Sequence, residues 1–546
     1  MSEWATSAER ARITQALAGL APPDAVTGTA RQRVLDQAAA SGRMPLSRWL
    51  RPALRFAVPA VGIAGIATVL VLALPRGEDA SRIAAGPQSE SCVAKRGFEV
   101  RILPTRPAVA VDQAGAVTVV WNDFDRTIRT ATNTGGGWQS TRLSGTGVFN
   151  TTSPALATNA AGDAIAVWIE GGQLTARYRP AGKAWGDPEH LGAVPGRAPL
   201  FDGPAAVVAS DGTATVAWPQ GEGLRAGRRT ADGRWTFTST ETAPTPGGTI
   251  PGPSEVDLAV DDQGTVAAVW MAGGASGISA ATWPAGAQRW NKDAALITTV
   301  RGRVGGFGSP KVAATPAGFV ATMFIGIAPS TTVRSTVPDP TGQGRVIAQA
   351  PRNDDQVVAT WLPRGQRAWT TAQRLSARGT TPTGDFPTVS GPDGTAAVAW
   401  VSAAAPGTPA YRRPGFPPRS LHVAIAQPGR TTFGQVLKVP GAAGTIASPS
   451  LAIDGQARLT TAWTLGANAF SGRNSSVQTT SLTPGSSWTT TRRLSETGPG
   501  PLNPSLAVNP TGALAAAWMR CANSNDLRLQ VIAGTAGAWA QPARVR

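Results

Sequence analysis

The chain has 546 residues and a formal net charge of +17, carried almost entirely by arginine. Of the 50 basic residues, 45 are Arg and five are Lys, and they are scattered along the chain. Together with the abundant Ala, Gly and Pro, this indicates the coding bias of a high-GC, actinobacterial-type genome and argues against a nucleic-acid partner. Two His and two Cys leave little material for a metal centre, so we expect no cofactor.

Residues 1–55 form a basic N-terminal tail. Two stretches with helical periodicity, 7–20 and 29–40, are separated by Pro22-Pro23. The second contains RQRVL and resembles part of the short cytoplasmic tails of membrane-bound bacterial anti-sigma factors. That resemblance implies a cytoplasmic protein partner such as a sigma factor. A solvated basic tail that only sets membrane topology is the alternative, and the narrow apolar stripe of these residues favours it.

Residues 56–74 are predicted to cross the cell membrane once. This uncharged stretch would form a helix about 28 Å long, close to the ~30 Å core of a bilayer. Eight Arg precede it, whereas Glu78 and Asp79 follow it, so we expect the tail in the cytoplasm and the rest outside. A cleaved signal peptide is the alternative, but its charged n-region would be unusually long. Residues 75–91 are then a linker, and residues 92–546 are an extracytoplasmic domain.

The domain at 92–546 contains eight repeats. Each has an apolar strand, a Gly turn, a second apolar strand closed by an aromatic residue, and a hairpin with another aromatic residue. The first copy is PAVAVDQAGAVTVVW (107–121), and the weaker fifth copy ends in Phe324. Repeats of roughly 40 to 50 residues made of short strands predict a propeller. We expect an all-β, eight-bladed β-propeller of four-stranded blades, or a seven-bladed ring in which the fifth repeat adds only a hairpin.

Fourteen of the eighteen Trp occupy the two repeated aromatic positions. The first two strands of each repeat are almost continuously apolar, as expected for strands buried on both faces. The turn between them, Asp112 to Gly115 in the first copy, uses Gly for a left-handed backbone. We therefore expect the Asp–Gly pairs to be turn residues, and the second-strand Trp to be core residues that pack against the next blade.

The hairpin aromatics resemble the Asp-box turns of sialidase-type β-propellers, which read S-x-D-x-G-x-x-W. ADGRW (231–235) is the nearest match, and AGKAW (181–185) is weaker. The resemblance covers about 98–546 and implies the same type of fold, although most Ser and Asp of the box are missing. An active enzyme of that type would need an Arg cluster, a Tyr nucleophile paired with Glu, and an Asp acid/base.

The chain meets these enzymatic requirements poorly. Tyr178 is expected to face the hairpin turns, away from the ligand face, and Tyr411 has no Glu near it in sequence. Asp123, Asp125 and Glu170 follow second-strand Trp residues, where hydrogen bonding at blade edges is their more common role. A sialidase-like glycoside hydrolase therefore stays only as an alternative.

Ring closure is predicted from a strand outside the eight copies. GFEVRIL (97–103) has the pattern of a fourth strand, and we expect it to pack onto the eighth blade. Cys92 lies just before this strand and Cys521 just after the second strand of repeat eight. In an exported protein this placement predicts a Cys92–Cys521 disulfide, with two buried free thiols as the alternative.

The candidate ligand site is a basic rim on the face that carries the loops between second and third strands. These loops are long in repeats five (325–355), six (401–420) and seven (464–476). Their candidate ligand-binding residues are Arg334, Arg345, Arg352, Tyr411, Arg412, Arg413, Arg419 and Arg473. Such a rim favours an anionic partner, either a wall polymer or other glycan or an acidic protein surface. Solvated insertions in an Arg-rich chain are the alternative.

The sequence thus favours a non-catalytic cell-surface propeller that binds an extracytoplasmic partner or an anionic polymer. A transmembrane sensor, in which the tail binds a cytoplasmic partner, is the second hypothesis. The glycoside hydrolase is the third.

Overall fold

The computed structural model divides into two compact units, residues 1–86 and 87–546. It describes residues 106–545 with gaps at 124–126, 136, 146–152, 195–202, 221–222, 241–253, 272–277, 292–303, 328–331, 339–344, 352–354, 379, 384, 405–418, 467–474, 498–500, 524–525 and 536–537. The predicted tail, span, linker, strand 97–103 and Cys92 lie outside the described residues. Within the described part, no helix has the length and hydropathy needed to cross a membrane.

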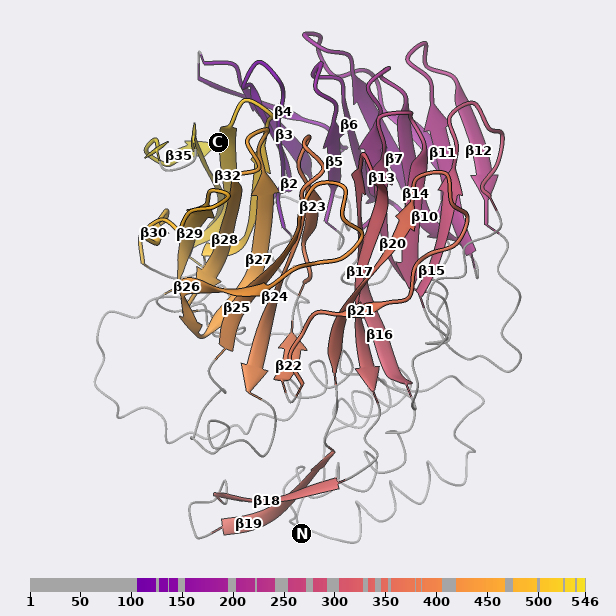
Figure 1. Ribbon diagram of the computed structural model, residues 1–546. Helices are drawn as coiled ribbons and strands as arrows, with labels where there is room; N and C mark the ends of the chain where they lie inside the picture. Colours follow the sequence, from indigo (N-terminus) through magenta and orange to yellow (C-terminus); the bar gives the residue numbers. More distant parts are fainter. Residues whose placement is uncertain are drawn as a thin grey trace, which may run out of the picture. The chain divides into compact units, whose positions relative to one another are not determined.

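Eight antiparallel sheets, one for each sequence repeat, form the blades of a β-propeller (Figure 1). Blade 1 consists of β1 (Ala108–Val111), β2 (Val117–Asn122), β3 (Ile128–Asn133) and β4 (Trp138–Arg142), and blade 2 of β5 (Ala155–Thr158), β6 (Ala164–Glu170), β7 (Gln173–Arg179) and β8 (Glu189–Ala193). Blade 3 consists of β9 (Ala205–Val208), β10 (Ala214–Gln220), β11 (Gly223–Arg229) and β12 (Trp235–Ser239). Blade 4 consists of β13 (Ser254–Val260), β14 (Val266–Met271) and β15 (Ile278–Trp283).

The strands of blades 5 to 8 follow the same order from the axis outward. Blade 5 consists of β16 (Val304–Thr315), β17 (Gly318–Ile327), β20 (Gln356–Pro363) and β21 (Gln373–Arg374), and blade 6 of β22 (Thr380–Thr383) with β23 (Thr388–Ser390), β24 (Ala396–Ala404), β25 (Arg419–Ala426) and β26 (Val436–Gly444). Blade 7 consists of β27 (Ile446–Ile453), β28 (Leu459–Leu465), β29 (Ser476–Leu482) and β30 (Arg492–Arg493). Blade 8 consists of β31 (Pro501–Val508), β32 (Ala513–Asn523), β33 (Asp526–Thr535), β34 (Ala538–Trp539) and β35 (Ala543–Val545).

The weak fifth repeat forms a complete four-stranded blade, so the ring has eight blades and the seven-bladed alternative is wrong. Its long insertion contains a separate two-stranded hairpin, β18 (Thr332–Pro338) and β19 (Arg345–Pro351), between β17 and β20. The loss of Trp at position 324 does not break the blade, because Phe324 still pairs with Val357 and stacks on Phe386 at 6.2 Å between ring centroids.

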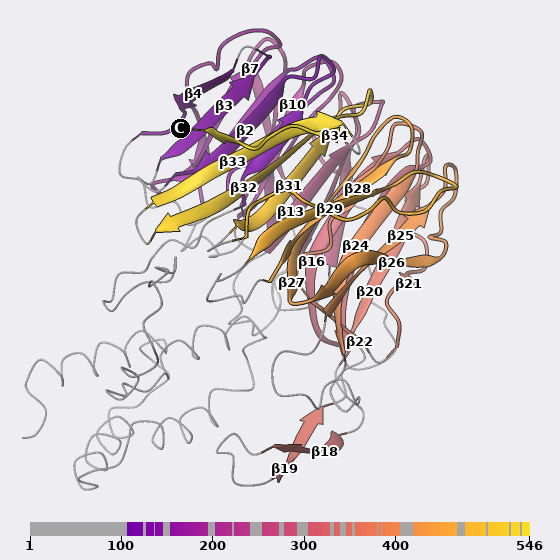
Figure 2. The ribbon, with the colours of Figure 1, turned by 90° about the vertical axis from the view of Figure 1, so that its left-hand side faces the viewer.

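The ring closes by direct packing of blade 8 on blade 1, where β32 and β33 lie beside β2 and β3 (Figure 2). Ser505 Oγ donates a hydrogen bond to the Pro107 carbonyl at 2.6 Å. Asn509 Nδ2 donates to the Asp112 carbonyl at 2.8 Å. These bonds join the first and last innermost strands and the turns that follow them.

The predicted place of strand 97–103 in blade 8 is filled by other residues. The outer edge of β33 is paired with β34 and β35, so the chain's own C-terminal strand completes this sheet. Val545 of β35 is buried in the cluster that also holds Val119 and Trp121 of blade 1. The physical reason is that repeat eight, like the others, supplies its outer strand after its own hairpin aromatic. The pairing of Cys92 with Cys521 stays a prediction.

The second-strand Trp residues are core residues, as predicted, but they pack on the preceding blade. Trp218 shares a buried cluster with Leu174 and Tyr178 of blade 2, and Trp121 shares one with Met519 of blade 8. The expectation that they pack on the next blade was wrong, because the face of the second strand that carries the Trp faces the preceding blade.

Blades 1, 5 and 7 share a hydrogen bond between a Ser hydroxyl at the outer edge and the start of the third strand. The Ser at the end of the Arg-Leu-Ser triplet in blades 1, 5 and 7 accepts the backbone N–H that begins the third strand. The acceptor and donor pairs are Ser144 and Ile128 at 2.8 Å, Ser376 and Val357 at 3.0 Å, and Ser495 and Val477 at 2.9 Å. In each of these three blades, this bond holds the start of the third strand close to the end of the fourth.

Candidate functional site

The predicted basic rim is described by the structure only at Arg419. Its Nη1 donates to the Ile446 carbonyl at 3.3 Å, and burial lowers its pKa. Arg419 therefore links blades 6 and 7. Arg334 and Arg345 fall on hairpin β18–β19, whose side chains are not described. The rim residues outside the described part are Arg352, Tyr411, Arg412, Arg413 and Arg473.

The carboxylates considered for catalysis have structural partners. Asp123 Oδ2 lies 2.7 Å from Nε of Arg129. Glu170 accepts hydrogen bonds from Nε1 of Trp168 at 2.9 Å and from the Gly145 N–H at 3.1 Å. Asp125 falls outside the described residues.

Tyr178 lies on the turn side of the ring, as predicted. Its hydroxyl donates to the Gly212 carbonyl at 2.8 Å. Burial, with a further contribution from Asp163, raises its pKa to about 12. A phenol held protonated in this way is a poor nucleophile at neutral pH. Within the described part of the chain, no group of three or more His, Cys, Asp or Glu is arranged to hold a metal ion.

The eight repeats can be compared at one position, the third-strand residue directly opposite the second-strand aromatic. Its side chain lies at the junction with the preceding blade. From blade 1 to blade 8 these residues are Arg129, Thr175, Arg225, Ser279, Val357, His422, Gln478 and Gln530. The scaffold therefore presents six kinds of side chain in one geometry, with Arg and Gln each occurring twice.

Blade 3 is distinctive because Arg225 lies between two aromatic rings. Its guanidinium carbon is 5.7 Å from the ring centroid of Trp218 and 5.4 Å from that of Phe237. Both distances suit a cation–π interaction. Nη1 donates to Oε1 of Gln220 at 3.3 Å, and Gly192 of blade 2 lies beside the guanidinium.

A glycine shapes the outer part of the same junction. Trp235 and Phe237, on β12, stack with centroids 5.7 Å apart and planes 11° apart. They lie across Gly227, where a Cβ atom would come within 2.8 Å of Phe237 and 2.9 Å of Trp235. At the equivalent position the other blades carry Ala131, Arg177, Ala281, Ala359, Ala424, Thr480 and Ile532. Only at blade 3 does the repeat leave room for this stack.

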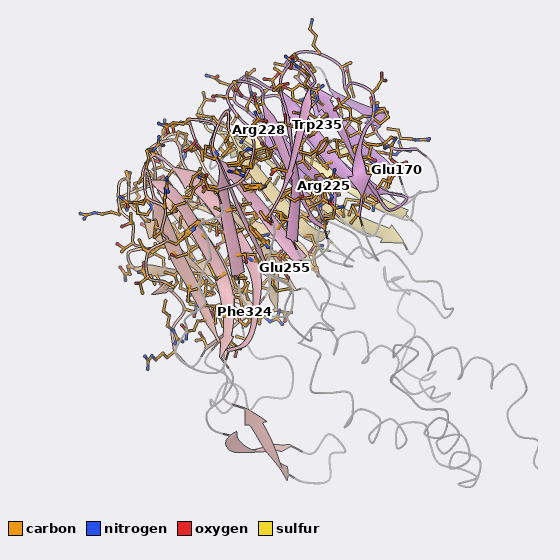
Figure 3. The ribbon with its side chains drawn as sticks, turned by 90° about the vertical axis from the view of Figure 1, so that its right-hand side faces the viewer. Glu170, Arg225, Arg228, Trp235, Glu255 and Phe324 are labelled. Carbon is orange, nitrogen blue, oxygen red and sulfur yellow. The ribbon has the colours of Figure 1, made fainter. Side chains whose placement is uncertain are left out.

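We call Trp218, Arg225, Gly227, Trp235 and Phe237 the blade-3 platform. Figure 3 shows Arg225 and Trp235 on the strands of this blade. Phe237 has 40% of its surface exposed and is the one exposed large hydrophobic side chain in the described part of the chain. Trp218 is fully buried beneath the arginine. The platform thus combines a partly exposed aromatic ring with a cation.

Neighbouring charged residues hold the platform in place. Glu189 of blade 2 accepts bonds from Nε and Nη2 of Arg229, both at 3.1 Å, and from Nε1 of Trp235. On the opposite face of β11, Arg228 donates to the carbonyls of Trp283 and Pro284 at 2.9 Å each. Arg228 and Arg229 are therefore bound between blades, whereas Arg225 borders the exposed ring of Phe237.

Sequence reasoning missed the platform, although a signal was present. The third strand of repeat three has Gly227 where the other repeats have larger residues. The fourth strand has two aromatic residues, in RWTFTS (234–239), where the other repeats have one. Arg225 gives no sequence signal by itself, because only the register of β10 and β11 places it opposite Trp218.

No protein-family model matches the chain, and a search of curated proteins found no match. Solved structures share its architecture at low identity. The BP39L lectin from Burkholderia pseudomallei is 12% identical with a TM-score of 0.40, covering 81% of this chain and 99% of that one. The polysaccharide lyase Uly1 is 10% identical with a TM-score of 0.41, covering 83% and 93%.

A leech intramolecular trans-sialidase is 10% identical with a TM-score of 0.33, covering 58% of this chain and 67% of that one. Sialidase, lectin and polysaccharide lyase folds are therefore all similar to this chain. At these identities and scores no functional conclusion follows from the similarity.

Proposed function

We propose that the chain is a non-catalytic binding protein whose blade-3 platform takes up a saccharide. The observation that carries the proposal is the exposed Phe237 ring, stacked on Trp235 and flanked by Arg225. Aromatic rings that lie exposed beside polar or charged groups are typical of ligand-binding surfaces. A repeat that departs from its seven copies to expose one is best explained by a ligand.

A sugar ring matches the chemistry of this surface. One face of a pyranose carries polarised C–H groups, which pack against the electron-rich face of an aromatic ring. Its hydroxyls accept hydrogen bonds from a neighbouring guanidinium, which offers five N–H donors in a fixed fork. The platform provides both features side by side.

The proposal includes the setting inferred from the sequence. The span at 56–74 would anchor the chain once in the cell membrane with the propeller outside, where a wall polymer or other anionic glycan is within reach. The high positive charge of the chain favours anionic partners at moderate salt.

The test measures binding of the full chain, purified in detergent, to a panel of neutral and acidic oligosaccharides. We expect Phe237→Ala to weaken binding at least tenfold, because the stacking surface is lost. Trp138→Ala, at the position of Trp235 in blade 1, is the matched control and should leave binding unchanged. Loss of binding in both variants, or in neither, would contradict the assignment to blade 3.

The same samples test the non-catalytic part of the proposal. New reducing ends or unsaturated products should not form above the buffer rate. Release of products at a rate abolished by Asp123→Asn would instead support the glycoside hydrolase.

A second candidate function is a transmembrane regulator, and Arg106 favours it. Arg106 precedes β1, where the chain enters the ring, and its Nη1 lies 3.3 Å from Oδ2 of Asp385 in blade 6. Its Nη2 donates to the Pro449 carbonyl of blade 7 at 2.9 Å. In the regulator proposal, these ties couple the segment that follows the span to the blades with long insertions.

Crosslinking in intact cells tests the regulator, by comparing the full chain with a variant that lacks residues 1–55. A cytoplasmic protein crosslinked only to the full chain supports it. An identical set of crosslinked proteins contradicts it.

A further inference from the structure

We infer that one of the eight described junctions, the one at blade 3, is a ligand site and that this site selects sugars bearing a carboxylate, which Arg225 recognises. The inference rests on the proposed function and adds the ligand's charge and the number of sites. Its basis is the contrast between blade 3 and the seven equivalent junctions.

The first observation is the charge balance of Arg225. Its one side-chain hydrogen-bond partner among the described residues is the neutral amide of Gln220. Other described arginines of blades 1, 3 and 7 face carboxylates: Arg129 faces Asp123, Arg229 faces Glu189, and Arg458 faces Asp454. The guanidinium of Arg225 therefore carries a charge that no described carboxylate balances.

The second observation is the position of this cation relative to the stacking ring. Arg225 Cζ is 5.4 Å from the centroid of Phe237. Arg225 lies over this ring and Trp235 stacks on it, so a sugar would contact the exposed part of Phe237, and the carboxylate of a uronic acid bound there would lie within reach of the guanidinium. Arg–carboxylate pairs are frequently bidentate and about twice as strong as neutral hydrogen bonds.

The third observation concerns the number of sites. The equivalents Thr175, Val357 and Gln478 are buried. His422 stacks on Trp400, and Gln530 accepts a bond from Nε1 of Trp518. These side chains are therefore buried in the ring, or already in contact with a Trp of their own blade.

The remaining equivalents also lack a ligand surface. Ser279 is short, and Arg129 is paired with Asp123. None of the seven has Gly two residues further along the strand. Among these eight positions, only blade 3 combines a stacked aromatic pair, a glycine and an arginine that has no carboxylate partner among the described residues.

The experiment uses calorimetry on the full chain in detergent with two probes, trigalacturonic acid and its methyl ester. These probes share a sugar backbone and differ in charge. We expect one molecule of trigalacturonic acid per chain, bound at least tenfold more tightly than the ester, the size typical of a hydrogen bond to a charged group. The preference should shrink as salt is added.

Three variants locate the effect. Gln220→Glu places a carboxylate beside Arg225 and should abolish the preference while leaving binding of the ester unchanged. Arg225→Gln should also abolish the preference, and it should weaken binding of the ester, because the guanidinium's hydrogen bonds to the sugar hydroxyls are lost. Arg129→Gln, at the equivalent position in blade 1, is the matched control and should keep the preference.

The outcomes separate the two proposals. Equal affinity for both probes, with both lost in Phe237→Ala, overturns the carboxylate inference and retains the saccharide platform. Two or more sites per chain overturn the single-site inference. Binding of neither probe overturns the carboxylate inference, and the proposed function falls as well only if no member of the oligosaccharide panel binds. Binding that Phe237→Ala leaves intact overturns the inference and the proposed function together.

Discussion

The junctions that precede blade 1 and blade 3 share one backbone geometry and differ in what they expose. In both, a buried second-strand Trp lies opposite an arginine of the third strand, Trp121 opposite Arg129 and Trp218 opposite Arg225. Arg129 is neutralised by Asp123. Arg225 instead lies between aromatic rings, one of them exposed.

The comparison shows how a repeat protein acquires a specific site without changing its scaffold. The register, the Gly turns and the buried Trp are common to both junctions and build the ring. Two local departures, Gly227 and Phe237, change the surface at blade 3, because Gly227 removes the Cβ that would exclude the aromatic stack. Scaffold and site can therefore be separated by mutation.

The largest effect should come from the shared scaffold. Trp121→Ala and Trp218→Ala each remove a side chain that is at most 2% exposed, and each should lower the free energy of unfolding by about 3 to 5 kcal/mol. Chemical denaturation followed by Trp fluorescence measures both. A loss at one junction several kcal/mol smaller than at the other would show that the two Trp are not equivalent core residues.

Gly227→Ala should be the next largest change and should act on the site. The new Cβ meets ring carbons of Phe237 and Trp235 below 3.0 Å, so the stack must shift, at a cost of about 1 to 3 kcal/mol. Saccharide binding should be lost as well. The reverse change in blade 1, Ala131→Gly, should cost about 0.5 to 1 kcal/mol and leave binding intact. Equal saccharide binding by wild type and Gly227→Ala would show that Gly227 is not needed for the platform.

Tyr178→Phe tests the support beneath the platform. Loss of the hydrogen bond to the Gly212 carbonyl should cost about 1 kcal/mol at neutral pH. Because folding raises the pKa of Tyr178 to about 12 from an ordinary value near 10, its contribution is present below pH 10 and is lost as pH rises toward 12. Absorbance titration in a Tyr411→Phe background reports Tyr178 alone, and a midpoint near pH 10 would contradict the burial.

His422 should give a weaker pH dependence in the acid range. Burial, with the charge of Lys438, lowers its pKa, so the folded protein takes up the proton at lower pH than the unfolded chain. Its stabilising contribution is therefore complete above the ordinary pKa of about 6.5 and declines as pH falls below it. The melting temperature of His422→Gln should fall less between pH 7 and 5 than that of wild type. If the melting temperatures of His422→Gln and wild type fell equally, His422 would not be the source of the pH dependence.

The smallest effect should come from a turn where blade 7 departs from the other repeats. Ala457 has φ of +58°, whereas the corresponding Gly115 in blade 1 has φ of +85°. Ala457→Gly should raise the free energy of unfolding by about 0.5 kcal/mol, since a left-handed backbone strains Ala more than Gly. Gly115→Ala should act in the opposite direction. If both substitutions changed the free energy of unfolding in the same direction, the turns of blades 7 and 1 would not be equivalent.

The architecture was predictable because its causes are local and repeated. A strand buried on both faces needs a nearly continuous apolar run, a tight hairpin needs Gly, and a large ring at the end of strand two fills each junction. Eight copies of that pattern identify the ring, even where Phe324 replaces Trp. Which face of the second strand carries the Trp is not encoded by periodicity, so the packing direction was predicted wrongly.

The platform was not predictable because it depends on contacts across strands. Arg225 and Trp218 are seven residues apart in sequence and meet only through the register of β10 and β11. The predicted rim was chosen from the length and charge of the loops, and the structure describes the side chain of only one of its residues, Arg419. The edge of β33, where we expected 97–103, is paired with β34 and β35, and 97–103 itself lies outside the described residues.

The seam between blades 8 and 1 has a consequence for synthesis of the protein. Ser505 and Pro107, joined across it, are 398 residues apart, and Val545 supplies part of the core of the first blade. Blade 1 therefore leaves the ribosome long before its covering residues exist, and its apolar face stays open while the intervening blades fold. A chain that ended before β35 would lack Val545 and leave part of the seam between blades 8 and 1 uncovered.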